Sequence, residues 1–132
     1  MNDDQMLQMQ QMQEMKQNLQ QMQQQLQLLE HQLLELDQVK DTIVEMKKSE
    51  KGQEILVPLG AGVFTKATIK DNEKIIMNVG SSVAVDKTLS EAEELVLKQI
   101  EELQKIQEQM NVEFAGVSQQ MQFLQMSQQA GN

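Results

Sequence analysis

Residues 55–87 read ILVPLGAGVFTKATIKDNEKIIMNVGSSVAVDK, and this stretch decides the fold of the chain. Its short runs of apolar and β-branched residues are separated by glycine, asparagine, aspartate and serine, which is typical of short strands joined by turns. The Gly-Ala-Gly at 60–62 and the Gly-Ser-Ser at 80–82 each turn the chain, and Asp71-Asn72 makes a good hairpin turn between the middle runs. The stretch therefore predicts four short strands that form two hairpins.

The apolar side chains of this stretch are too many for two free-standing hairpins, which are only marginally stable in water. We therefore expect the sheet to pack on copies of itself or on a partner, as an oligomerisation platform. The platform residues predicted in this way are Ile55, Val57, Leu59, Val63, Ile69, Ile75, Met77, Val79, Val83 and Val85.

The residues before the platform predict one long coiled-coil helix over about residues 5–51. Its apolar residues follow one another at alternating steps of three and four, which is the spacing of a heptad seam. These seam residues are Met12, Met15, Leu19, Met22, Leu26, Leu29, Leu33 and Leu36. The seam is expected to continue through Val39, Ile43 and Met46, with a break of register at Val39. Gly52 is the expected residue just after the helix end.

The residues after the platform predict a second long coiled-coil helix. Either Thr88 with Glu91, or Ser90 with Glu93, matches a capping box at its start. One set of apolar residues recurs there every seven positions: Leu89, Val96, Leu103, Met110, Val117 and Leu124. A second set is expected to fill the other side of the seam: Ala92, Ile100, Ile106, Phe114 and Met121. The predicted fold is α+β, an antiparallel two-helix coiled coil with two inserted hairpins, divided as 1–52, 53–88 and 89–132.

Antiparallel helices place both chain ends at one end of the coil, and charge is scarce in the two segments that meet there. Residues 5–29 carry only Glu14 and Lys16, and residues 109–132 carry only Glu113. Methionine, glutamine and phenylalanine stand in place of charges. Apolar residues that do not fit the seam register include Leu7, Phe123 and Met126.

Three interpretations of this charge-poor end compete. Its methionines and leucines can be ordinary coiled-coil core, which is the usual role of such a stripe. Residues 1–10 can be a frayed low-complexity segment. The interpretation that we favour for the residues outside the seam is a deformable apolar surface for variable partners. Methionine repacks against many shapes, and glutamine donates and accepts hydrogen bonds without charge selectivity.

Composition argues against several classes of function. A net charge of −9 without any arginine disfavours a nucleic-acid binder, and the scarcity of cations disfavours an anionic membrane surface. The chain has no cysteine, and its single histidine, His31, falls at an outward heptad position, so no metal site is expected. No nucleophile–base pair and no phosphate-binding loop is present, so neither an enzyme nor a cofactor is predicted. With no signal peptide or membrane span expected, the predicted location is cytoplasmic.

Two motifs carry a resemblance to a known family: VPLGAG at 57–62 and NVGSSVAVDKT at 78–88. With two hairpins between coiled-coil helices, the sequence resembles the α-class subunits of prefoldin, a hexameric co-chaperone, and the Gly-Ala-Gly form looks archaeal. The resemblance implies an assembly of two alpha and four prefoldin beta subunits, whose hairpins join in a double β-barrel platform carrying six coiled coils.

The resemblance also implies a function. The family binds unfolded client proteins at the coiled-coil tips without ATP and passes them to a group II chaperonin. On this chain the implied client-binding residues are Met6, Leu7, Met9 and Met12 on one helix, and Val117, Met121, Phe123, Leu124 and Met126 on the other. The alternative is a structural coiled-coil scaffold or adaptor that binds one specific folded partner.

Overall fold

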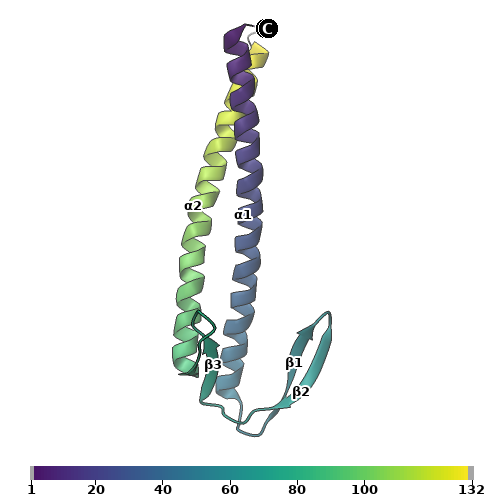
Figure 1. Ribbon diagram of the computed structural model, residues 1–132, viewed down its shortest axis with the longest axis vertical. Coiled ribbons are helices and arrows are strands. Elements are labelled where there is room, and N and C mark those ends of the chain that lie inside the picture. Colours follow the sequence, from purple (N-terminus) through teal and green to yellow (C-terminus); the bar gives the residue numbers. More distant parts are fainter. Residues whose placement is uncertain (1, 131–132) are drawn as a thin grey trace. The chain divides into compact units, whose positions relative to one another are not determined.

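The computed structural model describes residues 2–130 and the side chains of residues 2–127. Met1 and residues 131–132, which the predicted outer segments include, lie outside that range. The elements follow in the order α1 (Asp3–Lys48), β1 (Glu54–Gly60), β2 (Val63–Thr68), β3 (Lys74–Asn78), β4 (Ala84–Thr88) and α2 (Leu89–Ala130) (Figure 1). Two long helices with two hairpins between them confirm the predicted α+β fold. The described residues form two compact units: residues 2–34 with 101–130, and residues 35–100.

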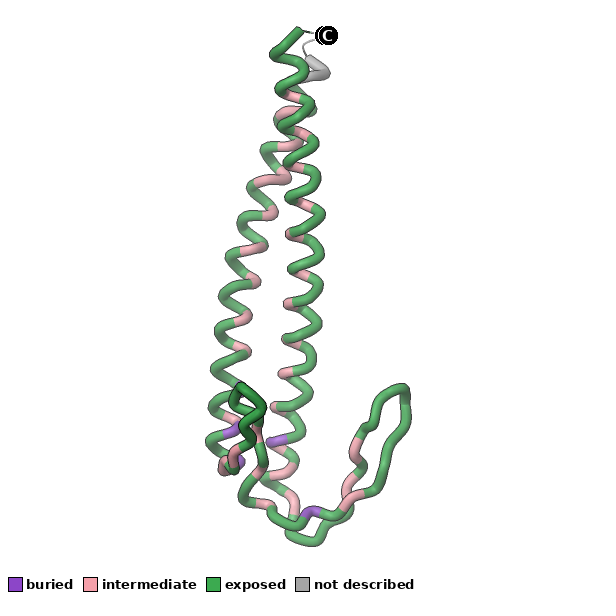
Figure 2. The backbone as a smooth tube through the Cα atoms, viewed as in Figure 1, coloured by how far each residue is buried: buried purple, intermediate pink, exposed green. Residues whose placement is uncertain are grey.

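The first unit is a pair of antiparallel helical segments packed along one seam. Every predicted α1 seam residue from Met12 to Leu33 is partly buried, and so are the α2 residues Leu103, Met110, Phe114, Val117, Met121 and Leu124. No described side chain of this unit is fully buried (Figure 2). A two-helix pair encloses each seam residue on one side only, so the unit is a thin structure with a long open surface.

Polar residues complete this seam at two positions that an apolar pattern does not reveal. Gln8 continues the α1 spacing one step beyond Met12 and is partly buried, and Gln107 does the same in α2. The prediction that Ile106 lies on the seam is wrong, because Ile106 is 45% exposed and the heptad step falls on Gln107. The glutamine amide keeps its hydrogen-bonding groups near water, so the helix pair tolerates it there.

The second unit holds the buried core of the protein. Ile43 of α1 packs with Leu89, Ala92 and Val96 of α2, and all four side chains are buried. The partly buried side chains Leu36, Met46, Ile75, Met77 and Ile100 pack against this cluster. Two of these, Ile75 and Met77, belong to β3, so the second hairpin is fixed to the helices through one of its faces. Lys47 and Glu93 form an ion pair between α1 and α2 in the same unit.

The predicted break of register in α1 is not observed. Val39 is 46% exposed, whereas Lys40 is only partly exposed and continues the three-four spacing from Leu36 to Ile43. Lys40 keeps its ammonium in water and donates a 3.0 Å hydrogen bond to Asp37. This bond and the Asp37 charge raise the pKa of Lys40 above its ordinary value. Lys40 therefore serves as a seam residue through its aliphatic stem, while its charge stays in water.

The end of α1 differs from the prediction in one detail. The helix ends at Lys48, and the Ser49 hydroxyl donates to the Met46 carbonyl at 2.7 Å, which satisfies one of the free carbonyl groups. Gly52 lies four residues beyond Lys48 with a φ of 89°, and its N–H donates to the Ile69 carbonyl at 2.7 Å. Gly52 therefore closes the base of the first hairpin and is not the helix cap.

The start of α2 confirms the first of the two predicted caps. The Thr88 hydroxyl oxygen accepts the Glu91 backbone N–H at 3.1 Å, and the same hydroxyl donates to the Glu91 carboxylate at 3.0 Å. Thr88 is also the last residue of β4, where it pairs with Lys74. The cap therefore sets the point at which the chain turns from sheet to helix beside the buried Leu89.

Thr88→Ala is expected to lower the free energy of unfolding by about 1 kcal/mol, because the Glu91 N–H loses its acceptor at the start of α2. Ser90→Ala is the matched control, since Ser90 is the cap that the sequence offered and the structure does not use. Chemical denaturation followed by circular dichroism measures both. Equal destabilisation by the two variants would contradict the assignment of Thr88 as the cap.

The four strands form two separate antiparallel sheets, β1–β2 and β3–β4. Strand β2 does not pair with β3, so the predicted hairpin turn at Asp71-Asn72 is wrong and this dipeptide is a linker between hairpins. The Asp71 carboxylate accepts the N–H groups of Glu73 and Lys74 at 2.8 and 3.2 Å, and the first of these bonds lowers the pKa of Asp71. The Asn72 amide donates to the Ser49 carbonyl at 3.2 Å, which ties the linker to the end of α1.

Both hairpin turns use the left-handed backbone region. Gly60 pairs with Val63, and the two residues between them, Ala61 and Gly62, have φ values of 52° and 78°. In the second turn Ser81 and Ser82 have φ values of 49° and 62°, and the Val83 N–H donates to the Gly80 carbonyl at 2.9 Å. Two successive positive φ values define a type I′ turn, which matches the twist of the strands. Serine is a poor residue for this conformation.

Ser82→Gly is therefore expected to raise the free energy of unfolding by about 0.5 kcal/mol. The relief of left-handed strain is worth about 1 kcal/mol, and the extra freedom of glycine in the unfolded chain offsets part of it. Ser82→Ala removes the same hydroxyl and keeps the strain, so it is expected to give no gain. Thermal unfolding of the three proteins measures the difference, and an equal gain from alanine would refute the strain argument.

Candidate functional site

The charge-poor end of the first unit, which we call the tip, comprises residues 5–18 of α1 and 116–127 of α2. The α1 helix begins at Asp3, so the frayed interpretation of the first ten residues does not hold for residues 3–10. Several large apolar side chains point away from the seam here: Met6 is 51% exposed, Leu7 57%, Met9 43%, Phe123 70% and Met126 68%. A packed helix pair gains nothing from these residues, so they are available to a partner.

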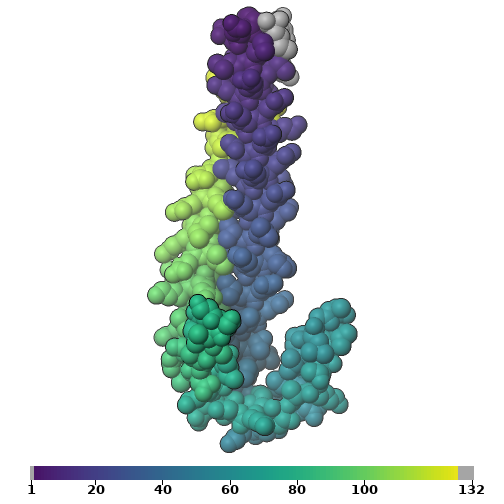
Figure 3. Space-filling view, viewed as in Figure 1, coloured from purple at the N-terminus to yellow at the C-terminus, as the bar shows by residue number. Residues whose placement is uncertain are grey.

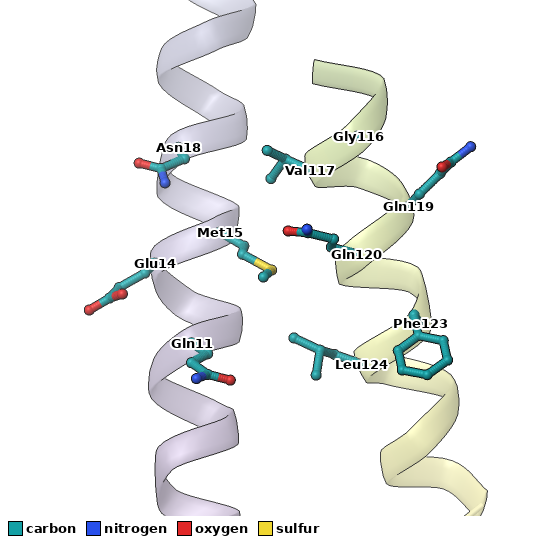
Figure 4. Close-up of a pocket in the computed structure, with 10 residues that line it drawn as sticks. All are labelled: Gln11, Glu14, Met15, Asn18, Gly116, Val117, Gln119, Gln120, Phe123 and Leu124. Atoms are coloured by element: carbon teal, nitrogen blue, oxygen red, sulfur yellow. The ribbon is translucent and has the colours of Figure 1, made fainter. Parts of the chain in front are cut away.

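Two grooves flank the seam at the tip. The larger, of about 960 Å³, is lined by Gln11, Glu14, Met15, Asn18, Gly116, Val117, Gln119, Gln120, Phe123 and Leu124 (Figure 4). The smaller, of about 260 Å³, is lined by Met9, Met12, Gln13, Lys16, Met121 and Gln125. Each groove combines apolar seam side chains with amide side chains, and each contains a single charged residue.

The predicted tip residues divide into two groups. Met6, Leu7, Met9, Phe123 and Met126 are exposed and reach solvent directly. The other four, Met12, Val117, Met121 and Leu124, are partly buried on the seam and line the two grooves. Sequence reasoning missed Met15 and the amide side chains as groove residues. Met15 lies on the seam itself and the amides flank it, and that heptad spacing is the signal that identifies them.

The predicted platform residues also divide. Ile69 is buried, and Ile55, Val57, Ile75, Met77 and Val85 are partly buried. Leu59, Val63, Val79 and Val83 are more than half exposed, and they lie at or beside the two turns. Leu59 is the extra residue of a bulge between Pro58 and Gly60. The two turn ends are therefore apolar and uncovered.

A second apolar face of the hairpins was not predicted. Leu56 is 65% exposed, Phe64 57% and Ile76 73%, and they alternate with the platform residues along their strands. In the registers Leu56 lies opposite Lys66, Phe64 opposite Pro58 and Ile76 opposite Asp86. Figure 3 shows the β1–β2 hairpin standing clear of the helical segments of its unit over its outer half. Each hairpin thus carries apolar residues on both faces, with unpaired strand edges.

A groove of about 460 Å³ separates the first hairpin from the end of α1. It is lined by Asp41, Thr42, Glu45, Met46, Ser49, Gln53, Ile55, Leu56 and Ile69. Its apolar wall comes mainly from the hairpin, and its polar wall comes from α1. The groove enlarges the surface of the second unit that a neighbouring subunit can cover.

The described residues show few features of a catalytic or metal-binding site. His31 is exposed, as its heptad position predicts. Among residues 2–130 no group of three or more histidine, cysteine or acidic side chains is placed to hold a metal ion. Over the same residues no helix is both long and apolar enough to cross a membrane. The surfaces that stand out are apolar contact surfaces.

Comparison with known proteins agrees with this architecture. A prefoldin alpha subunit of Methanopyrus kandleri is 40% identical over 78 residues, which is 59% of this chain and 50% of that protein. One of Methanosarcina acetivorans is 39% identical over 92 residues, 67% of this chain and 65% of that protein. The matches therefore span about half to two thirds of the length of these relatives.

A solved structure shares the fold. A chain of the filamentous PFD of Methanocaldococcus jannaschii superposes with a TM-score of 0.71, covering 87% of this chain and 95% of that one at 16% identity. The family model described as Prefoldin subunit matches residues 15–131, which include most of both helices and both hairpins. The chain therefore belongs to the prefoldin subunit family.

Proposed function

We propose that this chain is a subunit of an ATP-independent co-chaperone that holds unfolded proteins at the tip. The observation that carries the proposal is the set of exposed apolar side chains at the tip, led by Phe123 and Met126, which are 70% and 68% exposed. Unfolded chains differ in sequence, so a surface that binds many of them must deform. Methionine supplies this property, and the scarcity of charge removes selectivity for the charge of the client.

The second unit supports the assembly part of the proposal. Uncovered apolar residues on the outward faces and at the turn ends of the two hairpins favour joining with the hairpins of other subunits. We propose that two copies of this chain join four prefoldin beta subunits through the platform, as the family resemblance implies. Several tips then act on one client, which strengthens weak contacts through multivalency. A group II chaperonin is the proposed recipient of the client.

A specific folded partner, the alternative function, is less well supported. A coiled coil that recognises one partner helix uses fixed seam anchors and flanking charges that set the register. The tip grooves contain one charged residue each, Glu14 and Lys16, and the apolar wall of the smaller groove consists of the flexible Met9, Met12 and Met121. These features favour variable clients.

The direct test follows the aggregation of a chemically denatured client by light scattering in the presence of the assembled protein. The full-length chain is expected to suppress aggregation, and a chain without residues 1–12 and 120–132 is expected to lose suppression while it still assembles. Unchanged suppression by the shortened chain would show that the tip assignment is wrong.

A further inference from the structure

Three methionine side chains from two helices converge on the smaller tip groove. Met9 and Met12 of α1 and Met121 of α2 line it. Met9 and Met12 are three residues apart on one helix, which makes them neighbours on its surface. The other residues that line the groove are Gln13, Lys16 and Gln125. The groove therefore combines three thioethers with two neutral amides and one charge.

The size and exposure of this groove suit a single small ion. Its volume of about 260 Å³ is below the range of sites that hold drug-sized molecules. Met12 and Met121 are partly buried, whereas Met9 is 43% exposed, so the thioethers lie against the seam and remain reachable from solvent on one side. Lys16 is exposed, and its long flexible stem lets the ammonium extend into water, away from a bound cation.

The coiled-coil seam does not explain why all three residues are methionines. Leucine serves the same packing at Leu19 and Leu124, which also lie on the seam. Met9 lies outside the seam, so the packing of the helix pair requires no apolar residue there. What the three positions share is a thioether sulfur.

Thioether ligands select among metal ions. Methionine sulfur is a soft ligand, and soft ligands select Cu(I) over the harder divalent ions. No carboxylate of the described residues lines the groove, so it lacks the oxygen ligands that Ca²⁺ and Mg²⁺ take. It also lacks the imidazole and thiolate ligands that Zn²⁺ prefers. A thioether site is thus compatible with the lack of histidine, cysteine and acidic clusters among residues 2–130.

We propose that Met9, Met12 and Met121 bind one soft monovalent cation, Cu(I), through their three sulfur atoms. The ion joins α1 to α2 close to the chain ends, so its binding stabilises the helix pair at the tip. Neutral thioethers release no proton when the ion binds, unlike cysteine ligands. This site goes beyond the proposed function, because holding a client requires no metal ion.

The test titrates Ag(I), a soft monovalent ion that is stable in air, into the full-length chain in chloride-free buffer. Methyl NMR of the methionines follows the binding residue by residue. The methyl signals of Met9, Met12 and Met121 are expected to shift and to saturate at one ion per chain. The signals expected to stay unchanged are those of Met22, Met46, Met77 and Met110. Shifts spread equally over all methionines, or shifts that do not saturate, would overturn the inference.

The choice of ion tests the softness of the site. Cu(I), kept reduced with ascorbate under nitrogen, is expected to shift the same three methyl signals. Zn²⁺ at the same concentration is expected to shift none of them, because thioethers are poor ligands for it. A response to Zn²⁺ equal to the response to Cu(I) would contradict a site made of soft ligands.

The variant Met9→Leu/Met12→Leu/Met121→Leu removes the three sulfur atoms and nearly conserves apolar volume and helix propensity. It is expected to keep the helical circular dichroism of the wild type and to lose saturable Ag(I) binding in isothermal titration calorimetry. The matched control replaces three seam methionines that do not line this groove, as Met15→Leu/Met22→Leu/Met110→Leu. The control is expected to bind Ag(I) as tightly as the wild type. Retained binding in the first variant, or equal loss in the control, would refute the site.

The single histidine needs a control of its own, because imidazole also binds soft metal ions. His31→Gln is expected to bind Ag(I) with wild-type affinity, since the proposed ligands are all sulfur atoms. Loss of saturable binding in this variant would place the ion at His31 and rule out the thioether site.

Discussion

Phe64→Ser combined with Ile76→Ser is expected to prevent assembly with a prefoldin beta subunit while the chain still folds. The two side chains are 57% and 73% exposed on the outward faces of the hairpins. Burial of each in a subunit interface is worth about 2 kcal/mol, so loss of both weakens an interface about a thousandfold. Light scattering on a sizing column measures the mass of the mixture, and the variant is expected to elute as separate subunits.

The matched control replaces charged neighbours on the same faces, as Lys66→Ser with Asp86→Ser. These residues lie beside Phe64 and opposite Ile76 but contribute charge rather than apolar area. The control is expected to assemble, and the helical circular dichroism of both variants is expected to match the wild type. Assembly of the Phe64 and Ile76 variant at wild-type concentrations would contradict the role of these faces.

Replacing Leu7, Phe123 and Met126 by glutamine is expected to weaken the binding of an unfolded client about a hundredfold. Each side chain is more than half exposed, so its loss leaves the seam intact. Partial burial of each against a client is worth about 1 kcal/mol, and three such losses together give the hundredfold change. Titration of a labelled denatured client into the assembled protein measures the affinity.

The first unit itself supplies the control for this experiment. Leu28, Leu34 and Val112 are 64%, 58% and 72% exposed and lie outside the tip. Their replacement by glutamine removes a similar apolar area from the same helices. This second triple variant is expected to bind the client within about twofold of the wild type, since surface substitutions away from a site have small effects. Equal weakening by the two triple variants would show that clients bind anywhere along the helices.

The helical part of the fold follows from local sequence patterns because the heptad period is set by the geometry of one helix. The seam from Met12 to Leu36 was predictable for this reason, whereas the local pattern left the start of α2 open between the Thr88 and Ser90 caps and the structure selects Thr88. The two seam errors share one cause. The predicted seam followed the apolar residues and so included Val39 and Ile106. In the structure the strict heptad spacing continues, and Lys40 and Gln107 occupy those seam positions. Position in the heptad mattered more than residue type.

The hairpins show what local pattern does not settle. Alternation along a strand separates its two faces, yet which face meets a partner depends on the neighbours of the sheet. Leu56, Phe64 and Ile76 were missed because apolar residues occur on both faces of the hairpins. The pattern gave no reason to assign the face that carries these three residues to a partner. The Asp71-Asn72 error has a similar origin. A turn dipeptide indicates a change of direction, but strand pairing decides whether that change makes a hairpin.

At the tip, the exposed Leu7, Phe123 and Met126 were predictable from their departure from the seam register, and the grooves were not. Groove walls come from both helices, so they depend on the stagger of α1 against α2, which neither heptad pattern contains. Once antiparallel pairing is known, the amides of Gln11 and Gln120 fall on the flank of the seam, and the larger groove follows.

The central claim, that unfolded clients bind at the tip, is tested most directly by methyl NMR of the methionines in the assembled full-length protein. Met6, Met9, Met121 and Met126 report on the tip, and Met46 and Met77 lie in the second unit as internal references. On addition of a denatured client, the tip methyl signals are expected to shift or broaden while those of Met46 and Met77 stay unchanged. Shifts confined to Met46 and Met77, with unchanged tip signals, would contradict the account.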